Sequence, residues 1–228
     1  MFKENRFGLV IILGLLISST LWAQEIIPAA QYFRGISEQY GAIEDYQADI
    51  ALAVGDNSMT GVLYYRTPNL LRIDFTDPED QVIVVDGSEL MIHLPRQAVT
   101  MVQPLTRHND ATLSTMVTGQ GLNLLSRSYS ISYLEFPNFV PLDEGSRESV
   151  MKLKLEWRST DEGFRQIIIS IGENGYIRRM EAITKDYKDL TYDLTNIVIN
   201  QNIPEARFEF DPPPTSYTIN NFLFELEE

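Results

Sequence analysis

Short runs of alternating apolar and polar residues, repeated between residues 46 and 200, constrain this chain more than any other feature. Successive side chains of a β-strand point to opposite faces, so an alternation with a period of two predicts strands with one buried face. Turn residues separate the runs, as at Gly55-Asp56-Asn57-Ser58 and at Asp86-Gly87. Long antiparallel meanders of this kind curl around a core or close into a barrel, because an open apolar face is unstable in water.

Two segments break the alternation and predict helices instead. The first has apolar residues at helical spacing between Pro28, which suits a first helical turn, and Gly41, which suits a stop. Its apolar stripe consists of Ala29, Tyr32, Phe33, Ile36 and Tyr40. The second segment, Thr106 to Arg127, predicts two short helices. The chain is therefore expected to be mainly β (α+β), a strongly curved antiparallel sheet of about eleven strands with helices covering its apolar face.

Individual runs give more local expectations. Gln81 to Val85 is apolar without interruption after its first residue, which favours a strand covered on both faces. Asp86-Gly87 predicts a type I′ hairpin turn, since both residues tolerate positive φ. Residues 136–146, which contain two prolines and a glycine, are expected to form a loop. A period of two identifies two faces of each strand without showing which face is inside.

The beginning of the chain has the composition of a targeting segment. Lys3 and Arg6 precede an apolar run from Phe7 to Ile17, which is shorter than the roughly 20 residues of a membrane span. We expect residues 1–23 to be a signal peptide cleaved after Ala23, with an uncleaved anchor as the alternative. Residues 24–228 then form a single domain, since no shift of composition divides them.

Charge and side-chain chemistry exclude several classes of function. The formal net charge of −14 repels nucleic acid and anionic lipid headgroups. There is no cysteine, and His93 and His108 lack a third ligand in any metal-binding motif, so no metal site and no cofactor are expected. No phosphate-binding loop or nucleophile elbow occurs. A carboxylate-based hydrolase stays as a weak alternative because Asp and Glu are abundant.

The order of several motifs resembles the LolA family of periplasmic lipoprotein carriers. An amphipathic helix and an alternating strand are followed by a G-x-L-x-Y…P-N-L-L-R pattern, and then by a segment that ends at Asp86-Gly87. Leu94-Pro95 ends a strand before the helical insertion. The tail is similar to the family's N…F-x-F-x-P-P ending. The residues that carry the two patterns are Gly61, Leu63, Tyr65, Pro68, Asn69, Leu70, Leu71 and Arg72, and then Asn196, Asn200, Phe208, Phe210, Pro212 and Pro213.

The resemblance implies an unclosed β-barrel whose helical lid covers an apolar cavity. It also implies a monomeric periplasmic carrier, not an enzyme, which takes acylated lipoproteins from an inner-membrane ABC transporter to an outer-membrane acceptor. Family members often have an arginine directly before the Pro-Asn pair, where it helps to hold the lid closed. This chain has Thr67 there, and Arg66 is the nearest base and the candidate for the lid contact.

The apolar strand faces supply the candidate ligand-binding residues. They are Leu63, Tyr65, Leu71, Ile73, Phe75, Met101, Met116, Leu153, Leu155 and Trp157. The same residues could instead form an ordinary core, because a core and an apolar cavity use the same residue types. Two further alternatives stay open: a carrier of free lipid or another apolar ligand, and a regulatory or sensing module with the same fold.

Overall fold

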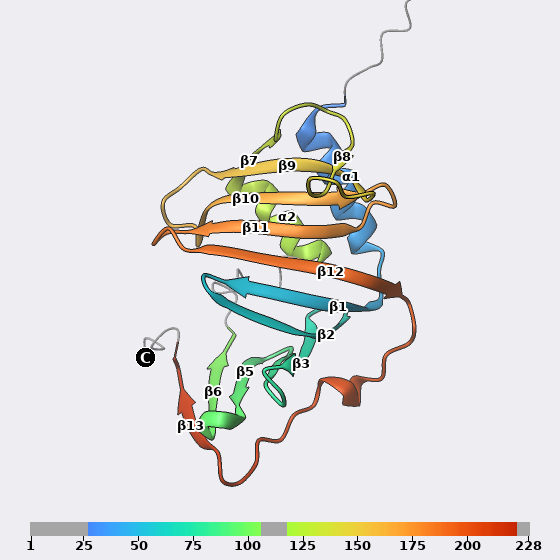
Figure 1. The fold of residues 1–228 in the computed structure, drawn as a ribbon. Helices are drawn as coiled ribbons and strands as arrows, with labels where there is room; N and C mark the ends of the chain where they lie inside the picture. Colours follow the sequence, from blue (N-terminus) through green and yellow to red (C-terminus); the bar gives the residue numbers. More distant parts are fainter. Residues whose placement is uncertain (1–26, 106–117, 223–228) are drawn as a thin grey trace, which may run out of the picture.

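The computed structural model describes residues 27–105 and 118–222, which form one 13-stranded sheet and two α-helices (Figure 1). The helices are α1 (Ala29–Gly41) and α2 (Gly119–Ser128). The strands before α2 are β1 (Asp45–Val54), β2 (Asn57–Arg66), β3 (Leu70–Asp77), β4 (Val82–Asp86), β5 (Glu89–Leu94) and β6 (Val99–Pro104). Those after it are β7 (Tyr129–Tyr133), β8 (Val140–Pro141), β9 (Ser149–Trp157), β10 (Phe164–Gly172), β11 (Ile177–Thr184), β12 (Asp189–Ile199) and β13 (Tyr217–Asn220).

The sheet is open, with β13 and β7 at its two ends. The strand order is β13-β6-β5-β4-β3-β2-β1-β12-β11-β10-β9-β7, and β8 pairs with β9 off this path. All pairs are antiparallel except β13 and β6. The pairing of β1 with β12 joins an N-terminal half (β1 to β6 with β13) to a C-terminal half (β7 to β12). The mainly β, unclosed architecture predicted from the sequence is confirmed, with slightly more strands than the eleven expected.

Both helices lie on one face of the C-terminal half (Figure 1). α1 has the predicted bounds: the Pro28 carbonyl accepts from the first-turn amides of Gln31 and Tyr32, and the helix ends at Gly41. α2 begins after Thr118, whose side chain accepts from the Gly121 amide and satisfies one otherwise unpaired N–H. The other predicted helix of the insertion falls on residues 106–117, outside the described part of the chain.

Burial alternates along the strands and identifies the inner face of the sheet, which is the face toward the helices. In β2 the buried side is that of Gly61, Leu63 and Tyr65, while neighbouring positions are partly exposed. The register of β3 places Leu71 and Ile73 opposite Tyr65 and Leu63, so the two strands bury the same face. The structure thus decides which of the two predicted faces is inside.

The outer face of the N-terminal half is covered by the segment that follows β12, residues 200–216, here called the C-terminal strap. Phe208, at the end of the 3-10 helix η3 (Glu205–Phe208), is 1% exposed, and η3 packs on β3 and β4. Val84 of β4 is fully buried on the same side, while Val85 is buried on the inner face. The prediction that this strand is covered on both faces is therefore confirmed for β4.

The hairpin between β4 and β5 differs in turn type from the prediction. Gly87 has φ of 98°, but Asp86 is not in the positive region that a type I′ turn requires. The Asp86 carboxylate instead accepts from the Ser88 and Glu89 amides and the Ser88 hydroxyl. Although partial burial raises the pKa of Asp86, these hydrogen bonds hold it below its ordinary value. Hydrogen bonds to the Asp86 side chain therefore stabilise this turn in place of a type I′ geometry.

Besides the predicted helix at residues 106–117, two predictions concern residues outside the described ranges. They are the signal peptide, residues 1–23, and the candidate cavity residue Met116. Within residues 27–105 and 118–222, neither helix has the length and apolarity needed to cross a bilayer.

Candidate lipid-binding face

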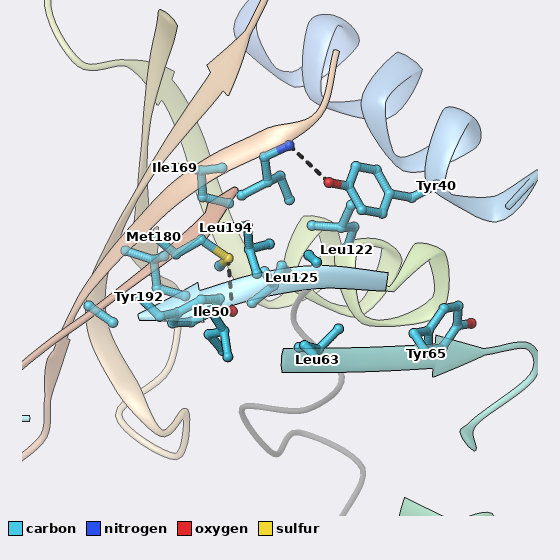
Figure 2. Close-up of a cluster of buried hydrophobic side chains, with 14 of the residues drawn as sticks. Tyr40, Ile50, Leu63, Tyr65, Leu122, Leu125, Ile169, Met180, Tyr192 and Leu194 are labelled. Carbon is cyan, nitrogen blue, oxygen red and sulfur yellow. Dashed lines mark hydrogen bonds between the residues drawn. The ribbon is translucent and has the colours of Figure 1, made fainter. Parts of the chain in front are cut away.

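The C-terminal half of the inner face is filled by the helices. Phe33 of α1 and Leu122 of α2 are fully buried against the sheet, as are the predicted cavity residues Leu153 and Leu155 of β9. Figure 2 shows part of the buried cluster to which these residues belong, with Leu122 and Leu125 of α2 beside labelled residues of β1, β2, β10, β11 and β12. In this conformation Leu153 and Leu155 are core, and a ligand reaches them only if α1 or α2 moves.

The helices cross closely where two glycines meet. A Cβ on Gly119 would lie 2.6 Å from both the Cα and the N atom of Gly41, so the crossing leaves no room for a side chain. The Ser37 hydroxyl donates to the Gly119 carbonyl in the same contact. α1 and α2 are therefore packed as a unit over the sheet.

The buried core includes the tyrosines Tyr40, Tyr46 and Tyr192. The Tyr40 hydroxyl accepts from the Ile177 amide at 2.9 Å, and the Tyr192 hydroxyl lies 3.1 Å from the Met180 sulfur (Figure 2). Burial, and then the neighbouring tyrosines, raise the pKa of Tyr46 well above its ordinary value. Burial likewise raises the pKa values of Tyr40 and Tyr192. These hydroxyls stay neutral at physiological pH and add no charge to an apolar surface.

The N-terminal half of the inner face carries a continuous row of apolar side chains, one per strand. Register pairs Leu63 with Ile73, Ile73 with Ile83, and so on through β6 to β13. The members of this transverse row are Leu63, Ile73, Ile83, Ile92, Met101 and Ile219. The outer part of the row is not fully covered, because Ile83, Ile92 and Met101 are only partly buried.

The other predicted residues lie around this row. Tyr65 and Leu71 pair with each other in the row on one side of the transverse row. Phe75 of β3 is buried on the other side of it, opposite Gly61. Trp157 is at the far end of β9, where its ring lies 4.9 Å from the Arg165 guanidinium. The structure therefore brings Leu63, Ile73 and Met101 into one row and separates them from the β9 candidates.

A cleft of about 550 Å³ opens between α2 and the turn that joins β2 to β3. On the sheet side it is bounded by Tyr65, Thr67 and Pro68, and on the helix side by the end of α1 at Tyr40 and Gly41 and by α2 residues from Gly119 to Arg127. Its lining is mixed, which suits an opening between water and an apolar interior better than a binding pocket for a purely apolar group.

Arg66 lies on the outer face, turned away from α2. Its guanidinium donates to the Ile203 carbonyl in the C-terminal strap at 2.7 Å. The Asp45 carboxylate accepts from the Gln201 amide at 2.7 Å and from the Ile203 amide at 3.3 Å. This position supports a role for Arg66 in anchoring the strap, and its part in lid closure stays a prediction.

Three members of the transverse row were missed by the reading of the sequence. Ile83 lies in the uninterrupted apolar run of β4, where no alternation singles out a face. Ile92 lies in a predicted strand whose inner face the alternation alone does not identify, and Ile219 lies in β13, a strand that the sequence pattern does not predict. A Tyr-Thr-Ile run directly after a proline-rich turn was the available signal for β13.

Comparison with known proteins agrees with the fold and the motifs. The family model described as outer membrane lipoprotein carrier protein LolA matches residues 54–211, more than half of the chain. An outer-membrane lipoprotein carrier protein of Pasteurella multocida (strain Pm70) is 25% identical over 206 residues, covering 89% of this chain and 90% of the relative.

Solved structures share the fold at low sequence identity. An uncharacterized conserved protein from Thermus thermophilus has a TM-score of 0.54 at 15% identity, covering 84% of this chain and 98% of that one. The Pseudomonas aeruginosa MucA/MucB complex structure contains a chain with a TM-score of 0.50 at 12% identity, over 80% of this chain and 61% of that one. Because the family match spans the sheet from the end of β1 to the C-terminal strap, the chain belongs to the LolA family of outer membrane lipoprotein carrier proteins.

Proposed function

We propose that this protein is a periplasmic carrier that binds the acyl chains of lipoproteins released from the inner membrane and delivers them to the outer membrane. The observation that carries the proposal is the division of the inner face: one half is packed by helices, and the other half carries the partly covered transverse row. The family match and the carrier-protein relative support the same role. No catalytic step or cofactor is part of the proposal.

The energetics of the cargo require a covered apolar surface. Each buried methylene is worth about 0.8 kcal/mol, so a sixteen-carbon chain that leaves a bilayer for water loses about 12 kcal/mol. An apolar face under helices offsets much of this cost. Delivery requires that the carrier hold the chain less tightly than its acceptor does, and incomplete covering of the row limits how much of the chain the carrier can bury.

The acidic surface fits transport between two membranes. The net charge of −14 repels anionic headgroups, which discourages a loaded carrier from adsorbing to the membrane that it has left. Cargo transfer then depends on proteins at each membrane: an ABC transporter that releases lipoproteins and an acceptor that receives them.

A release assay tests the proposal. Spheroplasts labelled with a radioactive acyl chain are incubated with the purified protein, and soluble complexes are isolated from the supernatant. Labelled lipoprotein that co-purifies with the carrier is the expected result. Labelled phospholipid alone would instead identify a carrier of free lipid, and an unloaded protein would favour the sensing role.

A further inference from the structure

The transverse row crosses the strands instead of following one of them. Its six side chains come from β2, β3, β4, β5, β6 and β13, each paired with the next in register. Neighbouring strands are about 4.8 Å apart, so five intervals give a track about 24 Å long. This length is comparable with that of an extended sixteen-carbon acyl chain.

Exposure rises along the row from its inner to its outer end. Leu63 is 2% and Ile73 8% exposed, Met101 is partly buried, and Ile219 is 38% exposed. Beyond Leu63 the register continues to Ala48 of β1, which is fully buried. The inner end, at Leu63 and Ile73, is therefore core in this conformation, and a ligand reaches it only if the cover of the inner face moves, while the outer end meets water at β13.

We infer that an acyl chain lies along this row with its methyl end toward Leu63 and its carbonyl end at Ile219, so that the cargo leaves over β13. The inference rests on the carrier function proposed above and adds the direction of the ligand. A carbonyl or amide at the closed end would lose its hydrogen bonds to water without a protein partner nearby in the apolar row. At Ile219 the same groups stay hydrated.

The strand β13 also suits the polypeptide that follows the acylated residue. It is the last strand of the described sheet, and all four of its residues are exposed. An edge strand presents unpaired backbone N–H and C=O groups, which bind extended peptides. The C-terminal strap, which ends in the hydrogen bond between Ser216 and Thr100, holds this edge in place.

Single-cysteine labelling tests the direction, because the chain has no cysteine of its own. Ile83→Cys and Ile219→Cys, each labelled with bimane, are mixed with stearic acid that carries a nitroxide at carbon 5 or carbon 16. Thr218→Cys is the matched control, since it neighbours Ile219 in β13 on the opposite face. Binding is measured separately from immobilisation of the nitroxide spectrum.

The expected result is a larger loss of fluorescence at Ile219 with the carbon-5 nitroxide, a larger loss at Ile83 with the carbon-16 nitroxide, and little loss at Thr218 with either. Immobilised ligand with the reverse pattern, or equal quenching at Ile219 and Thr218, overturns the direction while leaving an acyl carrier in place. A nitroxide spectrum that shows no immobilised ligand overturns both the direction and acyl binding.

Discussion

At the scale of single residues, the contact between Gly41 and Gly119 sets how closely the two helices approach. Neither glycine has a positive φ, so the demand is for space and not for backbone freedom. The sequence suggested Gly41 as a helix stop, but its partner is 119 − 41 = 78 positions away. The local sequence pattern does not reveal this contact, because the helix that contains Gly119 could form with another small residue at that position. Only the backbone of the other helix requires glycine there.

Replacing Gly119 with alanine tests this contact. The added methyl group overlaps the Gly41 backbone, so we expect Gly119→Ala to lower the free energy of unfolding by about 1–3 kcal/mol. Gly35→Ala in α1 is the matched control: no atom lies within 4 Å of its added Cβ, and helix propensity alone should stabilise it by up to about 1 kcal/mol. Urea denaturation of the two variants checks both values, and equal effects would contradict a tight crossing.

The buried tyrosines predict alkaline instability. Burial raises the pKa values of Tyr40, Tyr46 and Tyr192 above the unfolded value of 10.0, so the folded state keeps these protons longer than the unfolded state does. Their contribution is fully present below pH 10 and is lost as pH rises above it, by about 1.4 kcal/mol per tyrosine and pH unit. The share of the tyrosinate absorbance that comes from these three buried residues should appear together with the loss of circular dichroism above pH 10, separately from the share of exposed residues such as Tyr187 and Tyr217. Ionisation of all eleven tyrosines without unfolding would show that the three buried hydroxyls reach solvent.

At the scale of elements, the C-terminal strap crosses the outer face of the N-terminal half. Arg72 donates to the Arg207 and Glu209 carbonyls, and Arg207 stacks on Tyr64 at 4.2 Å. Tyr64 and Arg72, which make these contacts, alternate with the buried inner-face residues of β2 and β3. The Phe-x-Phe-x-Pro-Pro ending therefore resembles the family pattern for a structural reason: Phe208 closes the outer side of the sheet.

Arg66→Leu tests the anchoring of the strap. Losing the charged donor to Ile203 should destabilise the protein by about 1.5–3 kcal/mol and raise hydrogen exchange at the Gln201 and Ile203 amides, which donate to the Asp45 carboxylate. Arg34→Leu, at an exposed position of α1, is the control and should change neither. Faster exchange in α2 with an unchanged strap would instead assign Arg66 to lid closure.

At the scale of the whole molecule, the two halves of the sheet differ in what covers them. Helices fill the C-terminal half, so Leu155→Glu would place a carboxylate in a fully buried core and report on folding, not on ligand binding. The partly covered positions of the N-terminal half are better sites for a test of function. There a charge meets the proposed ligand surface without being forced into the core.

Ile92→Glu and Met91→Glu form a matched pair for this test. The two residues are neighbours in β5, both partly buried, and their side chains lie on opposite faces. Ile92→Glu should weaken acyl-lipid binding at least about tenfold, because the carboxylate lies in the transverse row, while Met91→Glu should bind normally. Binding of an acylated peptide, with circular dichroism to confirm folding, checks the pair. Equal loss in both variants would remove the row from the ligand site.

The sequence by itself determined most of the strands, both described helices and the residues that share a face, because these follow from periods of 2 and 3.6 set by local backbone geometry. It did not indicate β13, or the two-residue β8, which lies in the segment predicted to be a loop. It placed Leu63 with Tyr65, and Ile73 with Phe75, correctly on common faces. Only the tertiary structure decided which face is inside and which apolar residues are core. Met101 pairs with Ile219, and Arg66 donates to Ile203, although more than 100 residues separate the members of each pair. Contacts between such distant segments depend on how the whole chain folds, so no local sequence pattern predicts them.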